Sequence, residues 1–102
     1  MIEFLQTLSS VLTIAYVTGR PERTRQTTLA WFRKHCVPWK DGGILAMRTD
    51  VDHREDHIVK LELFMKWFCP ENVCAIIEDR DQVVDMWRGY GFLCLQPKRG
   101  NY

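Results

Sequence analysis

Apolar residues recur along this chain in two alternating patterns. The first has a spacing of three or four residues, which is typical of one face of a helix and predicts helices around 2–12, 21–35, 58–68 and 83–87. The second consists of short uninterrupted apolar runs rich in β-branched residues, which predict buried strands at 13–17, 44–47, 73–77 and 92–95. Asp52 and Glu55 have the spacing of a capping box ahead of the third helix.

Helices alternate with strands throughout, and no hairpin signal interrupts them. This order predicts the α/β class, with an open and mostly parallel sheet that is covered by helices on both faces. We expect one domain over residues 1–96, followed by a polar tail at 97–102. A polar terminal segment of this kind is commonly mobile, and we expect the same here.

The composition indicates which kinds of partner the protein binds and in which cellular compartment it is located. A formal net charge of +1 argues against the broad basic face of a non-specific duplex-binding protein, so any nucleic-acid contact should be local. The four cysteines lie in largely apolar segments without a Cys-x-x-Cys pair, which predicts buried free thiols and a reducing cytosol. The longest apolar run, 11–17, is too short to cross a bilayer. We therefore predict a cytoplasmic protein without a membrane partner.

Ligands of open parallel sheets bind beyond the carboxyl ends of the strands, so the residues that follow each strand are the candidates for chemistry. Thr18 and Arg20 flank Gly19 just after the first strand, where exposed backbone N–H groups suit an anion. The alternative is an ordinary loop that begins a helix, and the tetrapeptide Val17-Thr18-Gly19-Arg20 by itself favours that alternative. Lys60 follows Asp56 by one helical turn, and the local sequence favours the alternative that it is a surface lysine paired with that aspartate.

Glu78 and Asp79 directly follow the third strand. Adjacent carboxylates suit Mg²⁺, a hard cation that prefers oxygen ligands and keeps water and phosphate in its other positions. The alternative is that both acids only complement the positive end of the next helix. The six residues Tyr16, Trp31, Trp39, Trp67, Trp87 and Tyr90 could stack on nucleobases, although packing in a core explains most of them more simply.

A hydroxyl loop, a helical lysine and an acidic pair follow one another in the order of the second, third and fourth motifs of the haloacid dehalogenase superfamily. Over residues 2–96 the chain resembles the phosphatase domain of bacteriophage polynucleotide kinases, most specifically in 56–60 and 75–88. The resemblance implies a Rossmann-like core and a magnesium-dependent phosphomonoester hydrolase. Its substrate would be the 3′-phosphate end of a nucleic acid or another phosphomonoester.

The resemblance also implies a role for each candidate residue. Thr18 and Arg20 would hold the phosphoryl oxygens. Lys60, oriented by Asp56, would offset the charge that develops in the transition state. Glu78 and Asp79 would hold Mg²⁺. The family more often has Asp at the position of Glu78, so the longer side chain puts the metal geometry in question.

The family's first motif, Asp-x-Asp-Gly-Thr, which supplies the nucleophile, does not occur in this sequence; Asp50-Val51-Asp52 has the acid spacing but is followed by His53. The missing segment would also form the first, central strand of the sheet. We therefore expect the chain to be inactive alone unless another chain or segment supplies that motif. The alternative is a non-catalytic interaction module that self-associates or binds a protein partner through exposed strand edges.

Overall fold

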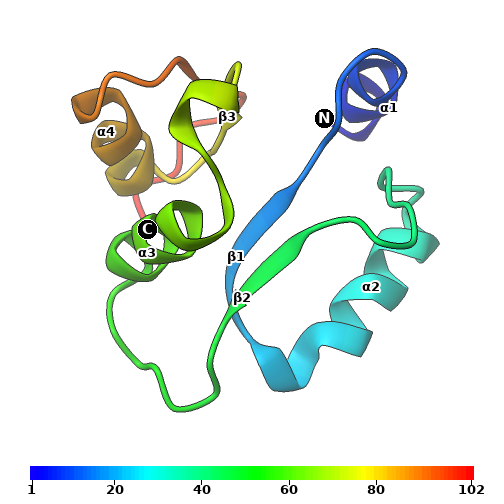
Figure 1. The fold of residues 1–102 in the computed structure, drawn as a ribbon, viewed down its shortest axis with the longest axis horizontal. Coiled ribbons are helices and arrows are strands. Elements are labelled where there is room, and N and C mark those ends of the chain that lie inside the picture. The colour runs from blue at the N-terminus through cyan, green and yellow to red at the C-terminus, as the bar shows by residue number, and fades with distance from the viewer. The chain divides into compact units, whose positions relative to one another are not determined.

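A computed structural model describes residues 1–102 and divides them into two compact units, each described here by itself (Figure 1). The first unit is Met1–His53, and the second unit is Arg54–Tyr102. The first contains helix α1 (Ile2–Ser9), strand β1 (Tyr16–Pro21), the 3-10 turn η1 (Glu22–Thr24), helix α2 (Arg25–Lys34) and strand β2 (Leu45–Arg48). The second contains helix α3 (Asp56–Trp67), the 3-10 turn η2 (Pro70–Asn72), strand β3 (Ile76–Ile77), helix α4 (Asp81–Gly89) and strand β4 (Cys94–Leu95).

In the first unit, β1 and β2 pair in parallel, with Tyr16 opposite Leu45 and Thr18 opposite Met47 (Figure 1). The ladder is irregular between Thr18 and Pro21, where β1 carries extra residues. Parallel strands need a crossover connection, and α2 supplies it. Its apolar face contributes to a core of Phe32, Val37, Leu45 and Met47, against which Ile2, Tyr16, Leu29 and Trp39 pack.

The second unit repeats this arrangement on a smaller scale. Strands β3 and β4 pair in parallel, with Ile76 opposite Cys94 and Ile77 opposite Leu95, and α4 is the crossover between them. The core consists of Phe64, Val83, Val84, Trp87 and Cys94. Helix α4 buries its apolar face here because its valines and tryptophan recur at helical spacing.

These features confirm the α/β class and the parallel pairing that the sequence predicts. All four helices form close to their predicted places, but the strands differ more. The first strand begins later and extends through Thr18 and Arg20, whereas the third shrinks from five residues to Ile76–Ile77. The structure contains two two-stranded sheets, so a single open sheet stays a prediction.

Two other predictions are wrong. No side-chain cap hydrogen bond forms at the start of α3, so Asp52 and Glu55 make no capping box, and the helix begins at Asp56. The four cysteines are free, as predicted, but only Cys94 is buried, while Cys36, Cys69 and Cys74 are exposed. All three lie just outside the helices and strands of the structure, and the apolar pattern of the sequence does not distinguish such positions from the interior.

The tail at 97–102 contacts the rest of the second unit. Gly100 is buried and forms a parallel bridge with Arg80, and the Asp81 N–H donates to the Gly100 carbonyl at 2.6 Å. None of the helices combines the length and the apolar character needed to cross a membrane.

Candidate functional site

The centre of the second unit's candidate site is Lys60, on α3. Its Nζ lies 3.1 Å from Asp56 Oδ2, one turn earlier on the same helix, and 3.0 Å from Glu78 Oε2, which follows β3. The three side chains retain only 13%, 16% and 12% of their exposure, respectively. Lys60 is therefore not a solvated surface lysine but the bridge between two largely buried carboxylates.

Arg80 completes this group as its second cation. Its Nη1 lies 3.2 Å from Asp56 Oδ2, so Asp56 binds both cations with one oxygen. Two carboxylates and two cations give the group no net charge, which is what burial requires of charged side chains. We call Asp56, Lys60, Glu78 and Arg80 the charge cluster.

Electrostatics in the charge cluster favour the ionised forms. Burial would raise the pKa of the Asp56 carboxyl, but attraction to Lys60 and Arg80 outweighs burial and holds that pKa below its ordinary value. Burial would likewise lower the pKa of Lys60, but Glu78 and Asp56 outweigh it and hold that pKa above its ordinary value. Lys60 is thus a fixed positive charge at neutral pH and cannot act as a base there.

The acidic pair has two distinct environments. Glu78 is tied down, because its Oε1 accepts the backbone N–H groups of Asp79 and Arg80 at 3.1 and 3.2 Å while its Oε2 faces Lys60. Asp79 is exposed, and its Oδ1 accepts a hydrogen bond from the Tyr102 hydroxyl at 3.1 Å. No group of three or more His, Cys, Asp or Glu side chains is placed to hold a metal ion. The donor chemistry of this pair fits Mg²⁺, but the pair is only part of a coordination shell.

Thr18 and Arg20 lie in the irregular part of β1, within the strand rather than after it. The Thr18 Oγ1 accepts the backbone N–H of Arg20 at 3.2 Å, and the Arg48 side chain donates to the Gly19 carbonyl. Arg20 is exposed, and Thr18 is half-buried. Thr18 pairs with Met47 and the ladder resumes at Pro21, so Gly19 and Arg20 fall in the irregular gap, where the Arg20 guanidinium is accessible.

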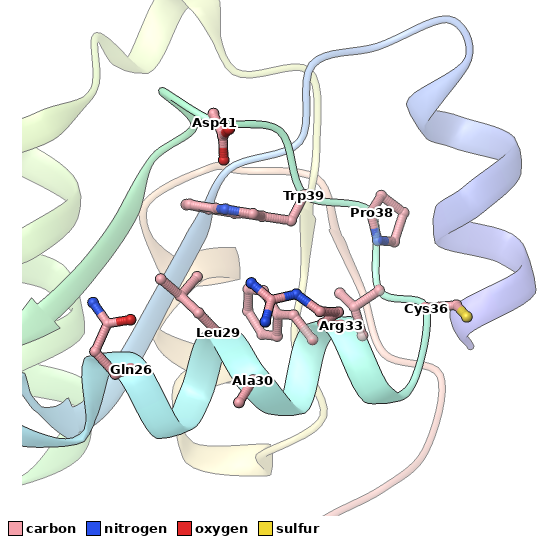
Figure 2. A pocket seen from close by; sticks show the side chains of 10 residues that line it. Gln26, Leu29, Ala30, Arg33, Cys36, Pro38, Trp39 and Asp41 are labelled. Atoms are coloured by element: carbon pink, nitrogen blue, oxygen red, sulfur yellow. The ribbon is translucent and has the colours of Figure 1, made fainter.

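Two hollows open on the first unit. Thr18 and Arg20 line the smaller, of about 300 Å³, together with the rings of Tyr16, Trp31 and Phe32. The larger, of about 790 Å³, lies between α2 and the loop that follows it, where the Trp39 ring faces Leu29 and Arg33 (Figure 2). Only the smaller hollow contains Thr18 and Arg20, the candidates for phosphate binding.

The candidate residues predicted from the sequence form only part of these two clusters. The structure brings Asp56, Lys60 and Glu78 together in the second unit and joins Thr18 to Arg20 in the first. Arg80 and Tyr102 were missed. Arg80 had a usable signal, because it directly follows the acidic pair, whereas nothing in the local sequence of the tail connects Tyr102 with Asp79.

The parallel strand pairs with helical crossovers, and the charged residues that follow the strands, define a small α/β domain of the haloacid-dehalogenase-like class. A family model described as the polynucleotide kinase PNKP phosphatase domain matches residues 1–102. The chain belongs to this family.

Two solved structures are similar to the chain. A chain in "Structure of the Pnkp1/Rnl/Hen1 RNA repair complex" is 29% identical with a TM-score of 0.89, over 99% of this chain and 32% of that chain. A chain in "Structure of Pnkp1/Rnl/Hen1 complex" has the same identity, TM-score and coverage of this chain, over 35% of its own length. The chain thus spans about a third of the length of the solved chains it matches.

Proposed function

We propose that residues 1–102 are the phosphate- and magnesium-binding part of a polynucleotide 3′-phosphatase. The observation that carries the proposal is the charge cluster: a buried lysine held between Asp56 and Glu78 beside an exposed acid, Asp79. Burial of four charged side chains stabilises a fold poorly compared with apolar packing. Such a cluster is better explained by a reaction that needs a fixed positive charge in a partly desolvated site.

In this proposal each unit has its own task. In the first unit, the Thr18 hydroxyl donates a hydrogen bond to a phosphoryl oxygen, and the Arg20 guanidinium neutralises the phosphate. Arginine suits this role because its planar fork of donors matches the oxygens of a phosphate group. In the second unit, Lys60 offsets the negative charge that grows as the phosphoester bond breaks, and Asp56 and Arg80 keep its position.

Asp79 is the better candidate for direct magnesium contact, and Glu78 is the second. Asp79 is exposed, whereas both oxygens of Glu78 already accept hydrogen bonds. When bound, Mg²⁺ supplies charge neutralisation and orientation of the phosphate. Glu78 would contribute through a water molecule or after a change of side-chain rotamer, because Lys60 occupies its Oε2.

The nucleophile comes from outside these residues in our proposal, because no Asp-x-Asp-Gly-Thr run occurs among them. A different part of the same gene product, or another chain, would contribute it, and with it the central strand. Strands β1 and β3 each have only one strand neighbour, which supports an additional strand. The domain would then cover residues 1–96, with the tail 97–102 packed on it.

The test is release of inorganic phosphate from a 3′-phosphorylated oligonucleotide, with and without Mg²⁺. The chain is assayed alone and with an added segment that carries Asp-x-Asp-Gly-Thr. We expect release only when both the segment and Mg²⁺ are present. No release in any combination would contradict the proposal, and release by the chain alone would contradict the need for a supplied nucleophile.

A matched pair of lysine substitutions controls this assay. Lys60→Met removes the buried charge and should abolish phosphate release. Lys34→Met removes an exposed lysine at the end of α2 and should leave release unchanged. Equal loss in both variants would point to an effect on solubility rather than on the site.

A second candidate function is a non-catalytic module that associates with itself or with a protein partner. The two-stranded sheets favour it, since every strand has one edge whose backbone groups have no strand partner. Light scattering after size-exclusion chromatography separates the two. A monomer that releases phosphate with the added segment excludes the second candidate, and a stable oligomer without such release supports it.

A further inference from the structure

The tail of the second unit, Pro97–Tyr102, lies against the loop that carries the acidic pair. Gly100 is its anchor: its N–H donates to Asp81 Oδ1 at 3.1 Å, and its carbonyl accepts the Asp81 N–H at 2.6 Å. A Cβ at Gly100 would come within 2.5 Å of a Tyr102 ring carbon and 2.8 Å of the Asp79 carbonyl oxygen. Glycine is therefore the residue that lets the tail approach this closely.

Tyr102 is held at three places. Its hydroxyl donates to Asp79 Oδ1 at 3.1 Å, and its backbone oxygen accepts a hydrogen bond from the Arg80 side chain. The Arg80 guanidinium also lies over the Tyr102 ring, 5.6 Å from its centroid. Arg80 in turn pairs with Asp56 at 3.2 Å, so the charge cluster itself supports the ring.

In spite of these contacts, 67% of Tyr102 remains exposed. An aromatic ring that is exposed gains little stability for the fold, and the contacts through its hydroxyl and backbone fix its position without covering it. A ring fixed before binding loses little conformational entropy when a ligand stacks on it. Stacking on an aromatic side chain is how proteins hold the bases of single strands without reading their sequence.

We propose that Tyr102 is the platform on which the terminal nucleobase of a 3′-phosphorylated single strand stacks. The inference rests on the proposed function and adds to it the part of the substrate next to the phosphate. The Tyr102 hydroxyl donates a hydrogen bond to Oδ1 of Asp79, the candidate magnesium ligand, so a base stacked on the ring would adjoin the phosphate that the metal orients. Lys98 and Arg99 are exposed just before it and can meet backbone phosphates, although Arg99 Nη2 also lies 3.3 Å from Asp81 Oδ2.

The proposal predicts a preference for nucleotide ends over small phosphomonoesters. The net charge of +1 provides little general attraction for a nucleic acid, so a contact with the base must provide part of the affinity. The ring's apolar face meets this need because every base has a flat face, whatever its hydrogen-bonding pattern.

Fluorescence anisotropy with a 3′-phosphorylated single-stranded oligonucleotide in Mg²⁺ tests the proposal. The chain is compared with Tyr102→Ala, Tyr102→Phe and Tyr102→Trp, and Tyr90→Ala serves as a matched control because Tyr90 is also exposed, at 63%. We expect Tyr102→Ala to weaken binding by about tenfold. The phenylalanine and tryptophan variants, which keep a ring, should bind nearly as well as the original chain, and Tyr90→Ala should not differ from it.

The same oligonucleotide without its terminal base is the second probe. The original chain should bind this shortened probe about as weakly as the Tyr102→Ala variant binds the complete oligonucleotide. The Tyr102→Ala variant should bind the shortened probe no more weakly than the original chain does. Equal binding of the complete oligonucleotide by Tyr102→Ala and the original chain overturns the proposal. So does an equal loss in Tyr102→Phe, since the hydroxyl rather than the ring would then matter, and so does an original chain that does not bind the oligonucleotide.

Photo-cross-linking gives a readout that uses only the unsubstituted chain. An oligonucleotide with a photoreactive thio-substituted terminal base should attach to Tyr102, as located by mass spectrometry, and attachment elsewhere alone counts against stacking. The phosphate-release assay separates this inference from the proposed function. If Tyr102→Ala does not change phosphate release, the phosphatase proposal stands and the stacking proposal is rejected. If binding depends on the terminal base but no phosphate is released, the stacking proposal stands and the phosphatase proposal is rejected.

Discussion

The two units hold their candidate residues in opposite ways. In the second unit, Lys60 is largely buried and fixed by two carboxylates, whereas in the first unit Arg20 is exposed and contacts Thr18 only through its backbone N–H. A residue that neutralises charge during a reaction benefits from a fixed position in a desolvated site, because no reorganisation is then needed. A residue that receives the phosphate must stay accessible to it. The comparison indicates a rigid charge cluster in the second unit and, in the first unit, an open bulge that we propose as the phosphate-binding segment.

The largest effect on stability should come from Lys60→Met. It leaves Asp56 and Glu78 without their shared cation, and since these side chains keep some exposure we expect a loss of about 2–3 kcal/mol, below that of a fully buried pair. Urea unfolding monitored by circular dichroism measures it. Lys34→Met, on the exposed end of α2, should change the free energy of unfolding by less than about 0.5 kcal/mol. A small effect of Lys60→Met would show that the cluster is less rigid than its geometry indicates.

The charge cluster of the second unit should contribute to the pH dependence of stability at both extremes. The pKa of Asp56 is lower in the folded chain than its ordinary 3.8, so its contribution is present above that value and disappears as the pH falls through the folded pKa. The pKa of Lys60 is higher than its ordinary 10.5, so its contribution is complete below that value and disappears as the pH rises through the folded pKa.

Urea unfolding at a series of pH values checks both limbs. Asp56→Asn should flatten the acid limb, because the asparagine does not titrate. The alkaline limb should persist in that variant, since Glu78 still faces Lys60. If Asp56→Asn loses stability at low pH as much as the original chain does, other carboxylates cause that loss.

A smaller effect should come from Tyr16→Phe in the first unit. The Tyr16 hydroxyl donates to the Pro38 carbonyl at 2.5 Å, while its ring packs on Phe32 with centroids 4.8 Å apart. Phenylalanine keeps the ring contact and loses the hydrogen bond, so we expect a loss of about 1 kcal/mol in unfolding free energy. Tyr90→Phe, at an exposed position, is the control and should be neutral.

The smallest effect on stability, together with a large effect on binding, should come from Arg20→Ala. Arg20 is exposed, so we expect its removal to change stability by less than about 0.5 kcal/mol. Binding of a 3′-phosphorylated oligonucleotide should weaken by about tenfold or more, as is typical when a charge-assisted hydrogen bond to phosphate is lost. Anisotropy and urea unfolding on the same variant measure both. Unchanged binding would remove the first unit's bulge from the proposed site.

Much of the secondary structure could be predicted because it depends on local spacing. The stripe on α3 and the valines and tryptophan of α4 are separated by helical intervals, which determine the buried face whatever surrounds it. Strand limits were less accurate, since a residue belongs to a strand only when a neighbour pairs with it. β1 extends beyond Val17 because Thr18 pairs with Met47 and Pro21 pairs with Arg48, which no local pattern encodes.

The pairing of Lys60 with Asp56 could be predicted from their spacing on one helix, but the burial of the pair could not. The sequence by itself determined which helices form, the α/β order and the identity of the acids, the lysine and the hydroxyl, because these depend on composition and on intervals of a few residues. Only the tertiary structure decided three contacts. Glu78 pairs with Lys60, 18 residues away in the sequence, Arg80 pairs with Asp56, and the Tyr102 hydroxyl donates to Asp79, 23 residues away in the sequence. Contacts between distant residues form when packing brings whole elements together, and packing depends on the entire core rather than on any one segment.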